Sequence, residues 1–509
     1  MMARVTSATV YGIDGIKIDV EVDIAHGLPA FNMVGLPETS VKESKERVRS
    51  ALKNAGFEFP GDRITVNLAP ADVRKEGSAF DLPIAVGILT AMGALKKESL
   101  EDHLIAGELS LDGRIKPVRG ILPVAMLARA DTMGTIIVPH KNGKEASIVR
   151  DIRVLGADHL LEVYHYFKGD GELPHFESED FLSRGPCLSQ DDDFSDIKGQ
   201  AQAKRALEIA AAGSHNILMI GSPGSGKTML AKRLSSILPM PGYSEAVETT
   251  RIHSIAGLLG PDRSLVMARP FRSPHHNISD AGLIGGGHVP RPGEVSLAHN
   301  GVLFLDEFPE FQRHVLDALR QPIEDAVVTI SRVSHAITFP ARFMLVAAMN
   351  PCPCGYFGDP KRACTCTGAQ IHKYRSRISG PLLDRIDIHI EVPPVEIREL
   401  AGDGREESSA TIRERVAKAR DIQRERFQKK NIHANAQMSA RDIRKYCKTG
   451  GEEHHLLETA VNKLSLSPRA YHRILKVART IADLEGLESI ASNHIAEAIR
   501  YRALDKRLI

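Results

Sequence analysis

A glycine-rich octapeptide carries the strongest chemical signal in the sequence. It follows an apolar run, residues 216–220, and precedes a helical pattern. Glycines let the backbone N–H groups of such a loop close on a polyphosphate at a helix N-terminus, where the lysine reaches the β- and γ-phosphates and the last hydroxyl joins the magnesium ion. We expect ATP and Mg2+ to bind this loop, which consists of Gly221, Ser222, Pro223, Gly224, Ser225, Gly226, Lys227 and Thr228.

Two acidic residues follow a second apolar run. Asp306 and Glu307 come directly after residues 301–305. Ligands of open parallel sheets collect at the carboxyl ends of the strands, so a strand here would deliver both carboxylates to the phosphate loop. We expect Asp306 to hold Mg2+ through water and Glu307 to polarise the attacking water. A strand that ends in Asp-Glu is common at ordinary turns, but in a chain with a phosphate loop it indicates ATP hydrolysis.

Four of the six cysteines lie within fifteen residues. Four thiolates, with glycine and proline between them to turn the chain back, have the composition of a tetrahedral zinc site. The two Cys-x-Cys pairs are tighter than the common Cys-x-x-Cys spacing, so free thiols in a loop are the alternative. A disulfide is not expected, because cytosolic thiols are normally reduced. The candidate Zn2+ ligands are Cys352, Cys354, Cys364 and Cys366.

Hydrophobic periodicity predicts the elements that must position these residues. Alternating strand and helix patterns in residues 1–168 predict a separate α/β domain. Residues 169–193 are rich in glycine, proline, serine and acid, which is typical of a linker. The phosphate loop then falls in an α/β domain, residues 194–400, and helical periodicity predicts an all-α C-terminal domain, residues 401–509.

Composition excludes a membrane protein. The chain has 509 residues, 42% hydrophobic and 26% charged, and no apolar run of eighteen residues. Its N-terminus lacks the pattern of a signal peptide, so we expect a cytoplasmic protein without a membrane partner. The formal net charge is +2, but residues 401–509 hold 22 Lys and Arg against 15 Asp and Glu. This basic end weakly indicates contact with a polyanion.

The segment from Arg74 to Pro117 resembles the proteolytic domain of Lon in the order and spacing of its motifs. The resemblance implies a ribosomal S5-like fold and places Ser78 at the position of the nucleophile. In the Lon pattern, a lysine shortly after the Gly-Arg-x-x-Pro motif acts as the base, but that position here is Val124. Because an unassisted serine hydroxyl is a poor nucleophile, we interpret this domain as an inactive scaffold.

Three segments before Asp306 resemble the magnesium-chelatase-like branch of the AAA+ ATPases: residues 269–276, 285–294 and 296–301. Together with the Lon-like front domain, they make the chain resemble the YifB/ComM family over nearly its whole length. The resemblance implies a homo-oligomer, a hexamer, that consumes ATP to move single-stranded or branched DNA. Such a motor would act as a helicase or in branch migration during natural transformation and homologous recombination.

The AAA+ resemblance also suggests a role for Asn350 and two arginines. Asn350 ends the apolar run of residues 343–349 and matches sensor 1, which positions water against the γ-phosphate; a simple Asn-Pro turn is the alternative. Residues 381–387 resemble an arginine-finger segment, so Arg385 would cross a subunit boundary and stabilise charge on the transferring phosphoryl group.

Two questions about these arginines stay open at the level of sequence. Arg385 could instead be a structural partner of Asp384 or Asp387. Sensor 2 would be Arg469, at the start of a C-terminal helix, with Arg473 as the alternative.

Two insertions favour a DNA motor over other ATPases. Residues 326–340 alternate like a hairpin, and the family resemblance makes its tip, with Arg332 and His335, a DNA contact in the pore of the ring. An ordinary edge hairpin is the alternative. Residues 250–299 are rich in glycine, arginine and histidine, and we expect a mobile loop at the same pore.

Two further classes of function compete with the DNA motor. A magnesium-chelatase-type motor would drive metal insertion into a porphyrin through partner subunits. A Lon-like peptidase is disfavoured by Val124 in the place of the lysine.

Overall fold

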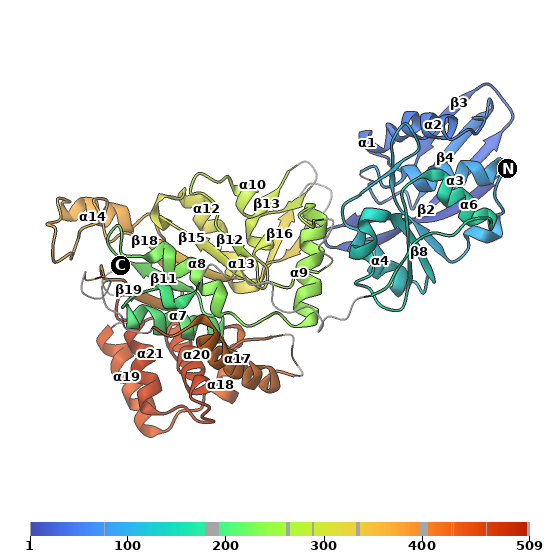
Figure 1. Ribbon diagram of the computed structural model, residues 1–509. Helices are drawn as coiled ribbons and strands as arrows, with labels where there is room; N and C mark the ends of the chain where they lie inside the picture. Colours follow the sequence, from blue (N-terminus) through green and yellow to red (C-terminus); the bar gives the residue numbers. More distant parts are fainter. Residues whose placement is uncertain are drawn as a thin grey trace. The chain divides into compact units, whose positions relative to one another are not determined.

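The chain divides into two compact units (Figure 1). Unit 1 consists of Met1–Gly185 and Tyr243–Val266, and unit 2 consists of Pro186–Gly242 and Met267–Ile509. The chain therefore leaves unit 1, returns to it for one segment, and leaves again. The computed structural model describes residues 2–75, 77–178, 193–260, 265–287, 290–331, 336–395, 406–428, 430, 432–464 and 466–505.

Unit 1 is built on an eight-stranded mixed sheet in the order β10-β9-β8-β5-β1-β2-β4-β3. β1 and β2 pair antiparallel, as their alternating patterns predict. β1 also pairs in parallel with β5, and the sheet continues in parallel through β8 to β9. The strands are β1 (Met2–Tyr11), β2 (Asp14–Ala25), β3 (Ala30–Val34), β4 (Arg63–Ala69), β5 (His103–Ile105), β8 (Thr135–Pro139), β9 (Arg153–Ala157) and β10 (His175–Phe176).

Helix α3 (Asp81–Ala91) lies in the core of unit 1, with every residue buried against β1 and β2. Its first residue, Asp81, accepts a hydrogen bond of 2.6 Å from Arg47. Burial raises the pKa of Asp81, and the bond from Arg47 opposes that rise. The other elements are α1 (Thr39–Lys42), α2 (Ser44–Asn54), α4 (Ile121–Ala130), α5 (Gly143–Ala146), α6 (Leu160–Lys168) and a short pair, β6 (Glu108–Leu109) with β7 (Ile115–Lys116).

The returning segment forms helix α9 (Tyr243–Ala256), which packs against α4. The Ser254 hydroxyl donates to the buried carboxylate of Glu145, and burial raises the pKa of that carboxyl. Arg251 pairs with Asp14 at the start of β2. This docking corrects the expectation of a mobile loop beginning at residue 250, because the first part of that segment is a helix with a buried face. It also interrupts the single domain expected for residues 194–400.

Part of the segment expected as a linker is a strand. β10 pairs antiparallel with β9, and the ring of Phe176 lies against Gly143 and Gly156, where a Cβ atom would collide with it. Phe176 therefore closes the edge of the sheet. Residues 179–192 of the expected linker lie outside the described residues.

Unit 2 contains a five-stranded parallel sheet in the order β12-β15-β18-β11-β19. All residues of β11, β15 and β18 are buried, which is typical of a parallel sheet covered on both faces. This burial explains why their sequences are continuous apolar runs. The strands are β11 (Ile217–Ile220), β12 (Phe271–Arg272), β15 (Val302–Leu305), β18 (Met344–Met349) and β19 (Ile388–Glu391).

Two strands outside this sheet form the predicted hairpin. β16 (Val327–Ser331) and β17 (Ala336–Pro340) pair antiparallel, but its tip, with Arg332 and His335, lies outside the described residues. The helices and remaining strands around the sheet are α7 (Ala201–Gly213), α8 (Lys227–Ile237), α10 (Asp280–Leu283), α11 (Glu294–Leu297), α12 (Arg313–Ala318), α13 (Arg320–Asp325), α14 (Gly368–Arg375), α15 (Gly380–Leu383), β13 (Gly285–Gly286) and β14 (Arg291–Pro292).

The C-terminal region is helical, as its periodicity predicts. α17 and α20 pack against α7, so this region shares one hydrophobic core with the parallel sheet. The buried side chains of Arg420 and Gln423 donate to the carbonyls of Ala211 and Ala212 near the end of α7. In the described ranges, no helix has both the length and the apolar character needed to cross a membrane. The helices are α17 (Ser409–Arg426), α18 (Ala440–Tyr446), α19 (Gly451–Leu464), α20 (Pro468–Leu484) and α21 (Ser492–Arg500).

Candidate ATP site and cysteine cluster

The phosphate loop joins β11 to α8, the arrangement that the sequence predicts. Gly224 and Gly226 have φ angles of +78° and +88°, in the left-handed region that favours glycine. The side-chain amide of Gln200 donates to the carbonyl of Ser225 at 2.6 Å. The segment that precedes α7 therefore holds the phosphate loop through this hydrogen bond.

The ammonium group of Lys227 lies inside the curve of this loop. It donates to the carbonyl oxygens of Gly221 and Ser222, at 2.7 and 3.0 Å, and to Oδ1 of Asn350 at 3.3 Å. Burial lowers the pKa of Lys227, and the nearby charge of Asp306 opposes that shift. The structure therefore brings Asn350 and Lys227, which are far apart in the sequence, into one site.

The two predicted magnesium ligands are in contact. The hydroxyl of Thr228 donates to Oδ2 of Asp306 at 2.7 Å. Hydroxyl and carboxylate oxygens are the ligands that Mg2+ prefers, so the pair fits this ion. The other oxygen of Asp306 accepts the backbone N–H of Glu307 at 2.9 Å. Glu307 itself has a φ of +52°, which turns the chain directly after β15.

His276 is a residue of this site that the sequence analysis left without a role. Its Nδ1 lies 3.1 Å from Oε2 of Glu307. The ring is held between His275, with centroids 4.1 Å apart, and the edge of Phe311, at 6.4 Å. β12 neighbours β15 in the sheet, so the residues after the two strands meet. Knowledge that β12 pairs with β15 would have predicted the contact between His276 and Glu307, but the sequence alone does not show this pairing.

The two expected arginines lie near Glu324. Arg385 donates to the carbonyl of Pro381 at 2.6 Å and pairs with Glu324 at 2.7 Å, rather than with either aspartate considered from the sequence. Arg469 is 59% exposed and lies 4.0 Å from the same Glu324. The alternative, Arg473, pairs with a buried aspartate, Asp387.

Asp387 is held as an anion inside the protein. Although burial alone would raise its pKa, Arg473 and His215 hold the pKa well below the usual range. Its second oxygen accepts the backbone N–H of Asn216 at 2.9 Å. Arg473 is therefore a structural partner of Asp387, and Arg469 is the more exposed of the two sensor candidates.

The serine at the Lon nucleophile position lies beside a carboxylate. The hydroxyl of Ser78 donates to Glu108, and the amine of buried Lys75 donates to the carbonyl of Pro70. Val124 is buried in α4. An apolar side chain thus occupies the position that the Lon pattern gives to lysine.

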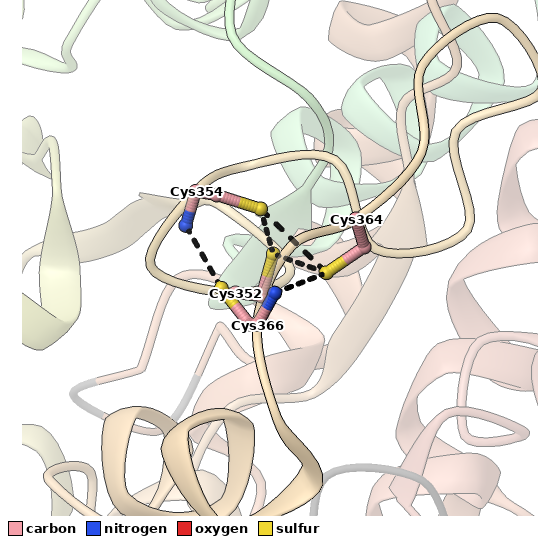
Figure 2. A group of neighbouring side chains, drawn as sticks. All are labelled: Cys352, Cys354, Cys364 and Cys366. Atoms are coloured by element: carbon pink, nitrogen blue, oxygen red, sulfur yellow. Dashed lines mark hydrogen bonds between the residues drawn. The ribbon is translucent and has the colours of Figure 1, made fainter.

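The four cysteines form one cluster (Figure 2). The sulfur of Cys352 lies 3.4 Å from that of Cys354 and 3.6 Å from that of Cys364, and all four sulfurs lie within 4.8 Å of one another. In a tetrahedral site with Zn–S bonds of about 2.3 Å, sulfurs are about 3.8 Å apart. The cluster therefore has the ligand number and size of a zinc site made of four thiolates, and Cys366 completes it.

Comparisons with known proteins agree with this geometry. Three family descriptions match: "Magnesium chelatase, subunit ChlI" over residues 193–400, "Subunit ChlI of Mg-chelatase" over 20–142, and "Magnesium chelatase, subunit ChlI C-terminal" over 406–502. The chain is 48% identical over 513 residues to "Competence protein ComM" of Haemophilus influenzae, covering 100% of this chain and 98% of the relative. It is 46% identical to "Uncharacterized protein YifB" of Salmonella typhimurium, with the same coverage.

A more distant match is partial. The "Magnesium-chelatase 38 kDa subunit" of Rhodobacter capsulatus is 29% identical over 177 residues, which is 31% of this chain and 50% of that subunit. The parallel sheet, the phosphate loop and the helical C-terminal region define a magnesium-chelatase-like AAA+ fold. The full-length similarities narrow this class. The chain belongs to the YifB/ComM family.

Two substitutions separate phosphate binding from water activation. Lys227→Ala removes an ammonium group beside the loop carbonyls, and the loss of charge-assisted bonds to phosphate costs about 1.5–3 kcal/mol, so we expect at least about tenfold weaker ATP binding. Glu307→Gln keeps ATP affinity but lowers turnover by about 10²–10⁴, the usual contribution of a general base. Equilibrium binding of a fluorescent ATP analogue and phosphate release measure the two effects. Normal turnover in Glu307→Gln would remove Glu307 as the base.

Proposed function

We propose that the protein is an ATP-driven ring motor on DNA, a helicase or branch-migration translocase of the ComM type. Its setting would be the cytoplasm, during natural transformation and homologous recombination. The observation that carries the proposal is the full-length similarity to a competence protein, together with an assembled phosphate loop and carboxylate pair. A domain-sized match alone would support ATP binding only.

Each residue of the site has a chemical task in this proposal. Bound Mg2+ would neutralise charge on the β- and γ-phosphates, and Thr228 and Asp306 would hold it. The ammonium group of Lys227 would leave the carbonyl oxygens of the loop and donate hydrogen bonds to phosphate oxygens instead. Glu307 would accept a hydrogen bond from the attacking water, and Asn350, already 3.3 Å from Lys227, would orient that water. His276 would keep the carboxylate of Glu307 in place.

Assembly into a hexamer would complete the site. Arg385 would reach the ATP of a neighbouring subunit. Arg469, in the helical C-terminal region, would act as sensor 2 toward bound ATP. Glu324 lies beside both guanidinium groups, so it would hold them when no phosphate is near. The shared carboxylate partner keeps the two arginines close together in one subunit.

DNA would contact the hairpin and the basic C-terminal region. β16 and β17 form a paired stalk, and Arg332 and His335 belong to the four residues that join them. A translocase must pass any sequence, so phosphate contacts suit it better than base contacts. Unit 1, proposed as a Lon-like scaffold, would not cleave peptides.

A magnesium-chelatase-type motor is the second candidate. All three family descriptions name a chelatase subunit, and a 29% identical relative carries that name. In this alternative the ring would remodel a partner during metal insertion, and DNA would have no effect on ATP turnover.

The DNA proposal predicts a specific loss in one double variant. Arg332→Ala with His335→Ala should keep basal ATP turnover and ring assembly but lose stimulation by DNA, because the phosphate loop and its carboxylates are untouched. ATP turnover is measured without DNA, with single-stranded DNA and with branched DNA. Wild-type binding should be independent of sequence and weaken with salt at a slope of about −0.7 to −0.9 per phosphate contact.

Two outcomes would count against this proposal. If the double variant migrates branched DNA at the wild-type rate, the hairpin does not couple ATP turnover to movement. If the wild-type protein neither binds DNA nor responds to it, the chelatase-type candidate takes its place.

The ring proposal predicts complementation. Arg385→Ala should bind ATP and assemble but hydrolyse about 10³–10⁵-fold more slowly, the contribution of an arginine finger. Mixing it with Lys227→Ala should restore part of the activity, because each variant lacks a different half of a shared site. ATPase assays on mixtures with demonstrated subunit exchange test this, and mixtures no faster than the separate variants would contradict it.

The cysteine cluster is proposed to hold Zn2+. We expect about one zinc per chain, and replacing Cys352 and Cys364 by serine should release it and lower the melting temperature, since binding energy at a structural zinc is also folding energy. Elemental analysis and thermal unfolding provide the measurements. Metal-free protein after purification without chelators would rule the site out.

A further inference from the structure

The segment that carries the four cysteines, residues 351–367, is called the cysteine loop below. We propose that a metal ion bound to the four cysteines holds the cysteine loop in place, and that the loop forms one side of the nucleotide site. With Zn2+ bound to the cysteines, the loop would keep Pro223 and Asn350 in position, and loss of the metal would weaken nucleotide binding. The inference rests on the proposed ATP site and adds a metal requirement to it.

The start of the cysteine loop is in contact with the end of the helix that follows the loop. The loop begins directly after Asn350 and ends at Thr367, whose hydroxyl caps α14. At the other end of α14, Arg375 donates to the carbonyl of Pro351 at 3.1 and 3.2 Å. Burial raises the pKa of the neighbouring Tyr374 to about 12, and the nearby backbone of Asn350 opposes that rise. Any displacement of the loop and helix therefore acts on the residue that also contacts Lys227.

Backbone N–H groups of the cysteine loop already surround the sulfurs. Those of Phe357 and Cys354 donate to the sulfurs of Cys352 and Cys366, at 3.3 and 3.4 Å. Such bonds orient metal ligands and stabilise thiolates. The only buried cysteine of the cluster is Cys352, and the other three are partly exposed. Apolar burial at the sulfurs is therefore limited, and a metal would supply the cross-link that holds the loop.

The cysteine loop approaches the phosphate loop at two points. A Cβ atom at Gly355, whose φ is +86°, would lie 2.5 and 2.6 Å from two ring carbons of Pro223. The backbone N–H of Lys361 and, to a lesser extent, the nearby side chain of Ser222 lower the pKa of Asp359 in the cysteine loop. The cysteine loop thus lies beside Pro223 and Ser222, next to the carbonyl oxygens that accept hydrogen bonds from the lysine of the phosphate loop.

This geometry couples two binding equilibria. If the metal stabilises the conformation that binds nucleotide, then nucleotide must stabilise metal binding by the same factor. Coupling factors between sites in one protein are usually about 5- to 150-fold. We expect about a tenfold effect in each direction.

A matched pair of glycines tests the contact. Gly355 and Gly358 both have positive φ, +86° and +82°, but an added Cβ meets Pro223 only at Gly355 and nothing within 4 Å at Gly358. Gly355→Ala should weaken binding of a fluorescent ATP analogue about tenfold while zinc content stays at the wild-type level. Gly358→Ala carries the same backbone strain and should bind the analogue like the wild-type protein. Equal affinities of the two variants for the ATP analogue would show that the contact between Gly355 and Pro223 does not affect nucleotide binding, which would overturn the proposal.

The metal side is tested on the wild-type protein. Zinc affinity is measured at equilibrium, by competition with a chromogenic chelator, with and without saturating ADP, and we expect about tenfold tighter zinc binding with ADP. Identical zinc affinities, or protein that holds neither zinc nor added cobalt, would overturn the proposal. If instead neither the wild-type protein nor Lys227→Ala binds nucleotide, the proposed ATP site is incorrect. The two failures are therefore distinguishable.

Discussion

The position of β18 between β11 and β15 is the constraint on which the candidate site depends. The three strands are parallel, so their carboxyl ends deliver the phosphate loop, Asn350 and Asp306 to one edge of the sheet. A shift of one residue in any of these strands would turn its side chains to the opposite face. Since β18 is apolar and buried on both faces, the close packing of its side chains, rather than a difference in polarity between the faces, opposes such a shift.

The opposite edge of the same sheet is fixed by polar contacts. The side chain of Asn216 accepts the backbone N–H of Leu345 at 2.8 Å and donates to the carbonyl of Arg385 at 3.2 Å. Asp387 accepts from the backbone of Asn216 and pairs with Arg473 of α20. Three strands and the helical C-terminal region therefore meet at one buried cluster. A buried charge that loses its partner is costly, so these positions keep the helices and the sheet in register.

The sequence predicted those parts of the molecule whose signals are local. The phosphate loop, the strand ending at Asp306 and the hairpin pairing all depend on residues that lie close together in the chain. The contact of His276 with Glu307 and that of Gly355 with Pro223 join segments far apart, and periodicity does not report which segments meet. The same limit hid the docking of α9, whose buried face includes Thr250 and Ser254 and looks polar in the sequence.

The return of α9 to unit 1 changes what a single cut in the chain can separate. Cleavage between Gly185 and Pro186 would divide the sequence, yet the second fragment would still hold α9, with Arg251 paired to Asp14 of the first. The two fragments would remain in contact through α9, which belongs to the second fragment and packs against α4 of the first. Removal of everything before Pro186 would instead leave Ala246 and Ile252 of α9 facing water. Without unit 1, the unit with the phosphate loop would therefore carry α9 without the surface against which that helix packs.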